Sequence, residues 1–297
     1  MTALQDTTVR PPPRNLSERL ANIAGRSPTH IILALLALIW LVPTIGLLIT
    51  SFRPSADMRA SGWWTVLFEP RFTLSNYQRV IEAEGLGGGF FNSLYITIPS
   101  TIFPLVIASM AAFALAWVKF PFRDTIFLTI VALLMVPVQI GFIPLVVGIR
   151  ESGTGLLTGF GAVWLAHTAY ALPFGIFLLR NFFITLPKDL IEAARIDGAS
   201  NFAIFRTIVV PLSVPAIAAY GIFQFLWVWN DLLMALVYAQ RNAIQPMTVK
   251  VTGLLGTFAT EWSLLAAAAF LIMIVPLVVF ISLQRYFVQG LLAGSVK

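Results

Sequence analysis

The chain has 297 residues and a formal net charge of +6; 58% of its residues are apolar and only 11% are charged. Soluble domains carry about 25% charged residues, so the composition excludes a soluble globular protein and predicts an all-α, polytopic membrane helix bundle. The absence of cysteine excludes disulfides, thiolate chemistry and cysteine-ligated metals. The two histidines, His30 and His167, lie far apart in the sequence, and no metal site is predicted.

Six blocks are long and apolar enough to cross about 30 Å of hydrocarbon, which takes roughly 20 residues. They are residues 31–50, 92–118, 125–149, 161–183, 213–239 and 262–283. Residues 1–30 are polar and contain no apolar core before a cleavage site, so we expect a cytosolic tail followed by an uncleaved anchor. Prolines within the blocks are expected to kink their helices: Pro43, Pro104, Pro137, Pro144, Pro173 and Pro276.

The basic residues predict the orientation in the membrane, because Lys and Arg are enriched in cytosolic loops. With the N-terminus inside, the inner segments hold 12 of the 19 basic residues and the outer segments hold 7. Both termini are therefore expected in the cytosol, with residues 284–297 as a C-terminal tail after the six-span transmembrane domain of residues 31–283. No basic patch is interleaved with aromatic residues, so no nucleic-acid partner is expected.

The loop between the fourth and fifth spans, about residues 184–212, is the longest polar stretch between two apolar blocks. Pro187 suits the first position of a helix, because its missing N–H has no partner there. Gly198 fits the end of that helix, where a positive φ is common. The apolar face of the helix comprises Leu190, Ile191 and Ala194.

A second helix follows the glycine and can be capped by Ser200 or Asn201. Pro211 limits how this helix continues into the fifth span. The residues alone leave two interpretations open: the helix pair lies on the lipid headgroups, or it binds another protein. The apolar side of the second helix comprises Phe202, Phe205, Ile208 and Val209.

The motif EAARIDG at residues 192–198, followed by Ile208, Val210 and Pro211, resembles the EAA loop of importer permeases of the ATP-binding-cassette class. The family pattern is EAA, three residues, G, nine residues, I-x-L-P; here only Val210 departs from it, since the family usually has Leu there. Three more segments resemble maltose-type sugar permeases of the smaller subunit type: NSLYITIPSTIFPLVIASMAAFALAWVKFPFRD, WVWNDLLMALVY and QRYFVQGLLAGSVK. The likeness covers roughly residues 30–297.

The resemblance implies a permease subunit of a binding-protein-dependent sugar importer with no catalytic site of its own. The chain lacks a GxxxxGK[ST] phosphate loop, so ATP and Mg²⁺ are expected on two separate ATP-binding-cassette ATPase subunits, and no cofactor is expected on this chain. A second permease subunit, an external sugar-binding protein and the lipid bilayer complete the expected partners. The positions that the resemblance marks for ATPase docking are Glu192, Ala193, Ala194, Arg195, Asp197, Gly198 and Ala199.

Two further regions are candidate contacts. The WVWND stretch offers aromatic faces and hydrogen-bonding groups that suit a sugar, namely Trp227, Trp229, Asn230 and Asp231. In the alternative interpretation, the amide and the carboxylate bond a neighbouring helix and the tryptophans belong to the interfacial belt. The loop of residues 240–261 is implied to face the sugar-binding protein, with Gly253 and Gly256 giving it flexibility.

The sequence favours a glucose-like sugar, α-glucoside or oligosaccharide by resemblance, and leaves a polyol or glycerol phosphate open. A secondary transporter would need an ion-coupling site, yet Asp231 is the only acidic residue within a predicted span and no inverted repeat is evident. A membrane enzyme or receptor would show clustered His, Asp or Glu at a membrane face, and the sequence has no such cluster.

Overall fold

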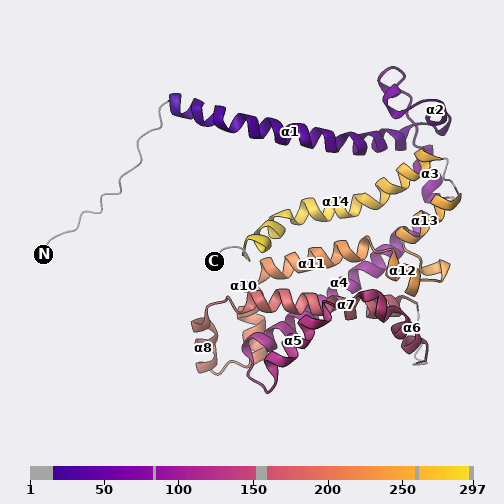
Figure 1. The fold of residues 1–297 in the computed structure, drawn as a ribbon. Helices are drawn as coiled ribbons and strands as arrows, with labels where there is room; N and C mark the ends of the chain where they lie inside the picture. Colours follow the sequence, from indigo (N-terminus) through magenta and orange to yellow (C-terminus); the bar gives the residue numbers. More distant parts are fainter. Residues whose placement is uncertain (1–15, 83–84, 152–158, 258–260, 294–297) are drawn as a thin grey trace.

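A computed structural model of the chain describes residues 16–82, 85–151, 159–257 and 261–293, and every regular element in these ranges is helical. Within these ranges, four helices are long and apolar enough to cross a membrane. They are α1 (Leu16–Phe52), α4 (Leu86–Trp117), α7 (Phe160–Phe183) and α14 (Trp262–Ala293) (Figure 1).

Two further spans are bent pairs of helices. The first joins α5 (Arg123–Leu133) to η2 (Val138–Gly141) and α6 (Phe142–Glu151) with a bend of 96°. The second joins α9 (Asn201–Ile204), η4 (Phe205–Val209) and α10 (Val210–Leu212) to α11 (Val214–Trp229) with a bend of 79°. Counting each pair as one span gives up to six candidate spans among the described residues.

In the predicted span of residues 125–149, the kink expected at Pro137 is a complete break, and residues 213–239 do not form the single helix that the sequence suggests. The first is interrupted before Pro137, because the residue before a proline is disfavoured in helical conformation. The second starts at Val214 after a bend and stops at Trp229; α12 (Leu233–Tyr238) begins after an interruption of three residues.

The long helices pack in a fixed order. Helix α4 lies against α7, α11 contacts α4, α7 and α14, and α14 contacts α1 (Figure 1). The contacts contain many small buried residues, as expected where lipid removes the hydrophobic drive between helices and close packing must hold them. These small residues include Ala108, Ala112, Ala162, Ala166, Ala216, Ala219, Ala266, Ala267 and Ala268.

The short elements gather at the two ends of the bundle (Figure 1). We call them the α3 end and the α8 end. The α3 end carries α2 (Ser55–Ala60), η1 (Trp63–Leu67), α3 (Ser75–Glu82), η5 (Asn242–Ile244) and α13 (Met247–Thr257); the α8 end carries α8 (Lys188–Ile196).

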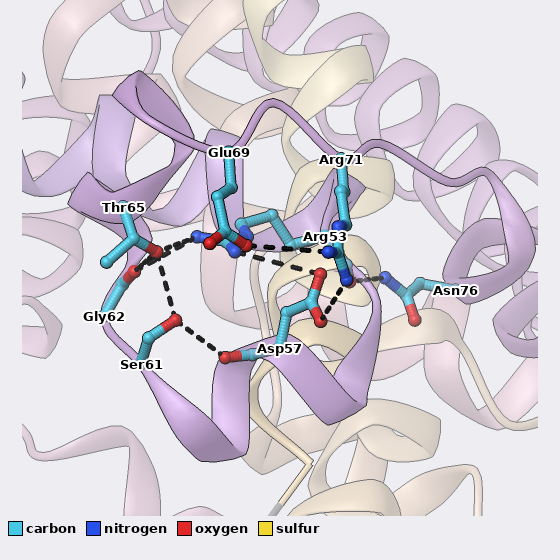
Figure 2. A network of polar contacts seen from close by, with 8 residues as sticks. All are labelled: Arg53, Asp57, Ser61, Gly62, Thr65, Glu69, Arg71 and Asn76. Carbon is cyan, nitrogen blue, oxygen red and sulfur yellow. Dashed lines mark hydrogen bonds and ion pairs between the residues drawn. The ribbon is translucent and has the colours of Figure 1, made fainter.

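A buried arginine organises the loop at the α3 end (Figure 2). Arg53 follows α1 and its side chain is only 1% exposed. Its guanidinium donates to Thr65 Oγ1 at 2.5 Å and to Gly62 O at 3.2 Å, and it lies 3.8 Å from the Asp57 carboxylate. The Asn76 amide donates to the backbone oxygen of Arg53 at 2.8 Å. These contacts join the end of α1 to α2, η1 and α3, because a buried guanidinium needs partners for its donors.

The same loop is tied to the start of α14. Arg79 of α3 forms an ion pair with Glu261 at 2.7 Å, and the hydroxyls of Ser55 and Ser263 lie 2.8 Å apart. The loop between α1 and α4 therefore connects the ends of two spanning helices.

Gly175 permits the close approach of α7 and α11. A Cβ at this position would overlap the ring of the buried Tyr220, whose hydroxyl donates to Ala171 O at 3.1 Å. The absence of a side chain thus lets a tyrosine of one helix bond the backbone of the other.

We expect Gly175→Ala to lower the apparent melting temperature of the detergent-solubilised protein, because overpacking a close contact costs about 1–3 kcal/mol. Gly88→Ala is the matched control: Gly88 also lies within a helix, but nothing lies within 4 Å of an added Cβ there, and alanine gains up to about 1 kcal/mol of helix propensity. Equal melting temperatures for the two variants would contradict the tight contact.

Candidate coupling loop and substrate cavity

Helix α8 is fastened to the bundle on one side. Pro187 is its N-cap and Lys188 its first residue, one position later than the sequence predicts. Ile191 is buried in the cluster that also contains Leu179 and Phe183 of α7. Arg195 donates through Nη2 to Trp117 O, at the last residue of α4, at 2.6 Å. Helix α8 is thus attached to both α4 and α7.

Gly198 ends α8 in the left-handed conformation, with φ of +80°. The N–H of Gly198 donates to Arg195 O at 3.1 Å, and the N–H of Ala199 donates to Ala194 O at 2.9 Å. These two bonds define a Schellman turn, which satisfies the last carbonyls of the helix and requires a positive φ at the glycine. The predicted turn at Gly198 is present.

Ser200 caps the second helix by accepting a hydrogen bond from Ala203 N at 3.2 Å. The helix then runs through one turn of π-helix, η4, directly before α10, which contains Pro211. A proline has no N–H to give to the preceding turn, and a π-turn next to it adjusts the remaining bonds. The bend into α11 follows at Ser213.

The side of the loop that faces away from the bundle carries most of the motif. Ala194 and Ala199 are half-buried and pack against the core cluster. Two residues that the sequence places on the apolar faces, Leu190 and Phe202, are instead exposed. The exposed docking candidates are Glu192, Ala193, Arg195, Asp197 and Gly198.

A cavity of about 510 Å³ lies where the bent span α5–η2–α6 meets α7 and α11. Most of its wall is apolar. Its polar and aromatic lining comprises His167, Tyr170, Phe174, Gln224 and Trp227. Of these, Trp227 is the only candidate from the WVWND stretch, and it is 65% exposed.

Trp229 lies on another side of α11. It is 2% exposed, and its indole N–H donates to Ile272 O of α14 at 3.0 Å. Its ring stacks on Phe225 and meets Phe90 edge to face. These contacts pack Trp229 between α11, α14 and α4.

Asn230 and Asp231 occupy the interruption between α11 and α12. The amide of Asn230 donates to Leu226 O at 2.8 Å. The carboxylate of Asp231 accepts from Ala235 N at 3.1 Å, and its Oδ2 lies 3.9 Å from Nε2 of His167. Asp231 thus satisfies the start of α12 and approaches α7, as the alternative interpretation of this stretch expects; a sugar contact by either residue stays a prediction.

Sequence reasoning did not assign His167, Tyr170 or Phe174 to a pathway. The signal for His167 was its place within a span, since polar residues in membrane helices face the bundle interior or a cavity. Tyr170 and Phe174 carried no such signal, because aromatic residues are common on every face of a membrane helix.

The described part of the segment of residues 240–261 is mostly helical, and not the flexible loop that the sequence suggests. Gly253 and Gly256 both lie within α13. Asn92 of α4 donates to Ala243 O and Gln245 O, each at 3.0 Å, and so holds the segment to α4. The expectation that Gly253 and Gly256 make this segment flexible is wrong, because both lie in a helix. That the segment faces a binding protein stays a prediction.

The sequence profile described as "Binding-protein-dependent transport system inner membrane component" matches residues 104–292. The chain is 50% identical over 288 residues to the osmoprotective compounds uptake permease protein GgtD of Synechocystis sp., covering 95% of this chain and 96% of that protein. It is 46% identical over 259 residues to the alpha-glucoside transport system permease protein AglG of Rhizobium meliloti, covering 83% of this chain and 68% of that protein.

The melibiose/raffinose/stachyose import permease protein MelC of Bacillus subtilis is 33% identical over 279 residues, with 92% of this chain and 99% of that protein covered. A chain in the crystal structure of a bacterial transporter involved in the import of alginate has the same fold, with a TM-score of 0.72, 22% identity, and 93% and 100% of the two chains covered. The all-α membrane fold and the family that the EAA loop predicts are confirmed. The chain belongs to the inner membrane components of binding-protein-dependent transport systems and is a multi-pass permease subunit of an ATP-binding-cassette importer.

Proposed function

We propose that this subunit forms, with a second permease subunit, the translocation pathway for a neutral α-glucoside or related oligosaccharide, and that two ATPase subunits drive it through α8. An external sugar-binding protein delivers the substrate at the α3 end. In this arrangement the α8 end and both termini are cytosolic, and ATP and Mg²⁺ act on the ATPase subunits.

The attachment of α8 is the observation that carries this proposal. One side of α8 is bonded to the bundle through Ile191 and Arg195, and the other side presents Glu192 and Ala193 to the surroundings. A small residue beside a single carboxylate permits close approach by another protein surface. A helix resting on lipid headgroups would instead turn its whole apolar side to the bilayer. Here Ile191 faces protein, and the apolar Leu190 and Ile196 are exposed beside Glu192, where a partner surface would cover them.

The substrate class is supported by relatives and by the cavity. Two relatives carry names that refer to an alpha-glucoside and to melibiose, raffinose and stachyose. Trp227 and Tyr170 offer aromatic faces, and Gln224 and His167 offer polar atoms, in a cavity of a size that holds small molecules. The residues that the structure places around this cavity include no Lys or Arg, which disfavours glycerol phosphate. A polyol stays the second candidate, because one relative is named for osmoprotective compounds.

The substrate test is to reconstitute the complex with its binding protein and to measure which compounds stimulate ATP hydrolysis. We expect α-glucosides to stimulate more than polyols and glycerol phosphate. Sugar uptake by this chain without any ATPase subunit would overturn the proposal in favour of a secondary transporter.

Glu192→Lys is expected to abolish sugar-stimulated ATP hydrolysis or to prevent the ATPase subunits from co-purifying, because the variant reverses the charge of the exposed carboxylate. The matched control is Asp189→Lys, the same charge change at another exposed position of the same helix. The docking role is excluded if Glu192→Lys retains normal uptake, or if Asp189→Lys is equally inactive.

Gly198→Val is expected to impair coupling while the protein still inserts in the membrane. The left-handed conformation costs a valine residue about 1–2 kcal/mol or more. Nothing lies within 4 Å of a Cβ added at Gly198, so the effect comes from the backbone alone. Gly198→Asn is the control, because asparagine tolerates this conformation; we expect it to retain most of the ATPase stimulation. Full activity of the valine variant would show that the turn is not required.

Trp227→Ala is expected to raise the sugar concentration for half-maximal uptake roughly tenfold, equivalent to about 1.4 kcal/mol, with little change in the amount of assembled complex. Trp227→Phe keeps an aromatic face and is expected to restore most of the affinity. An unchanged half-maximal concentration in the alanine variant would remove Trp227 from the pathway.

A further inference from the structure

The short helix η1 divides its side chains into two stripes. In a 3₁₀-helix, residues three apart lie above one another. Trp63 and Val66 form the inner stripe, with Val66 buried and Trp63 half-buried. Trp64 and Leu67 form the outer stripe and are 58% and 79% exposed; Phe68, the next residue, is 83% exposed. One stripe thus packs on the protein, and a second, equally apolar stripe is mostly exposed.

The contact between Trp63 and Gly46 fixes the position of η1 along α1. A Cβ at Gly46 would lie 2.9 Å from the indole of Trp63, so the ring rests on the bare backbone of α1. Gly46 precedes Phe52, the last residue of α1, by about 9 Å at 1.5 Å per residue. The chain therefore doubles back beside α1 after α2, and does not extend away from its end (Figure 1).

This position corresponds to the boundary of the hydrocarbon. The span Pro28–Phe52 has 25 residues, which is about 37 Å of helix for about 30 Å of hydrocarbon. When the span is centred, each end projects by about 3–4 Å, and Gly46 lies about 5 Å inside the boundary. A segment packed against Gly46 thus lies at the level of the headgroups and the outermost acyl carbons.

The fold-back is held by the buried guanidinium of Arg53. Its hydrogen bonds go to Gly62 O and Thr65 Oγ1, which directly precede and lie within η1 (Figure 2). The hydroxyls of Thr65 and Ser61 also lie 3.0 Å apart. Since Thr65, the polar side chain within η1, faces inward to these partners, the exposed side of η1 is left to the apolar stripe.

We propose that Trp64, Leu67 and Phe68 insert into the interfacial region of the bilayer beside α1, so that η1 is a membrane anchor at the α3 end. The outer stripe continues the apolar surface of α1, where Ile45 and Leu48 are exposed. Tryptophan is enriched at this depth because its ring is apolar and its N–H is polar, and interfacial segments bury their apolar face about 5–10 Å deep. The anchor holds the end of α1 and, through Arg79 and Glu261, the start of α14 at a constant depth.

The test uses a nitroxide spin label, because the chain has no cysteine and each variant introduces one site. Phe68→Cys is labelled in the full chain, purified with the subunits that accompany it and placed in phospholipid nanodiscs. The collision rates of the label with oxygen, which concentrates in lipid, and with a water-soluble nickel chelate are then compared. Leu38→Cys, in the middle of α1, is the lipid reference, and Gln78→Cys, exposed on α3, is the polar reference at the same end. The wild-type chain, which has no cysteine, is treated with the label in the same way, so that any signal from it measures label bound to the other subunits.

We expect the ratio of oxygen to nickel-chelate collisions at position 68 to lie below that at position 38 and several-fold above that at position 78. A ratio equal to that at position 78 would place the segment in water and overturn the proposal. Low collision rates with both reagents would also overturn it, because the stripe would then be covered by a second permease subunit or by a binding protein. The proposal depends on the membrane location of the chain and not on its substrate, so sugar measurements do not affect it.

Discussion

Backbone groups at helix interruptions must find partners inside this bundle, because the surrounding hydrocarbon offers none. At the α3 end, the Asp231 carboxylate accepts from Ala235 N where α12 begins. The hydroxyl of Ser93 accepts from Met247 N, at the start of α13, at 2.9 Å, and Thr248 donates to Asp231 O at 2.8 Å. Short polar side chains on α4 and α13 thus permit α11 to stop within the bundle, and the positions of α12, α13 and the neighbouring cavity depend on them.

Continuous spans were predictable from the sequence, and interruptions only in part. Mean hydropathy over about 20 residues does not depend on local backbone geometry. It therefore locates continuous spans such as α4 and α7, and it locates broken spans equally well without showing that they are broken. Proline was an ambiguous signal: Pro104, Pro173 and Pro276 lie inside continuous helices, whereas the breaks lie beside Pro137 and Pro211. Whether a proline breaks a helix depends on neighbouring groups that replace the lost hydrogen bond, and a single sequence does not show those neighbours.

The WVWND stretch shows the same limit at the level of side chains. Trp227 and Trp229 are two positions apart, about 200° around a helix of 3.6 residues per turn, so they could not share one surface while the helix continued. One tryptophan therefore faces α14 and the other faces the cavity. Which of the two faces α14 depends on how α14 packs against α11, and the sequence does not show this. For Asp231 a sequence signal existed, since an aspartate directly before a run of apolar residues favours capping of the next helix.

The coupling loop and the cavity lie on the same two helices, and this relates the two proposed roles. The cluster that holds Ile191 also contains Phe183 of α7 and Tyr220 of α11. Farther along these helices, Tyr170 and Trp227 line the cavity; Trp227 lies about 10 Å beyond Tyr220 at 1.5 Å per residue. Close-packed interiors transmit displacements because they have little free volume. A shift of α8 imposed by an ATPase subunit would thus move the ends of α7 and α11 together, and the cavity between them would change shape without any contact to ATP.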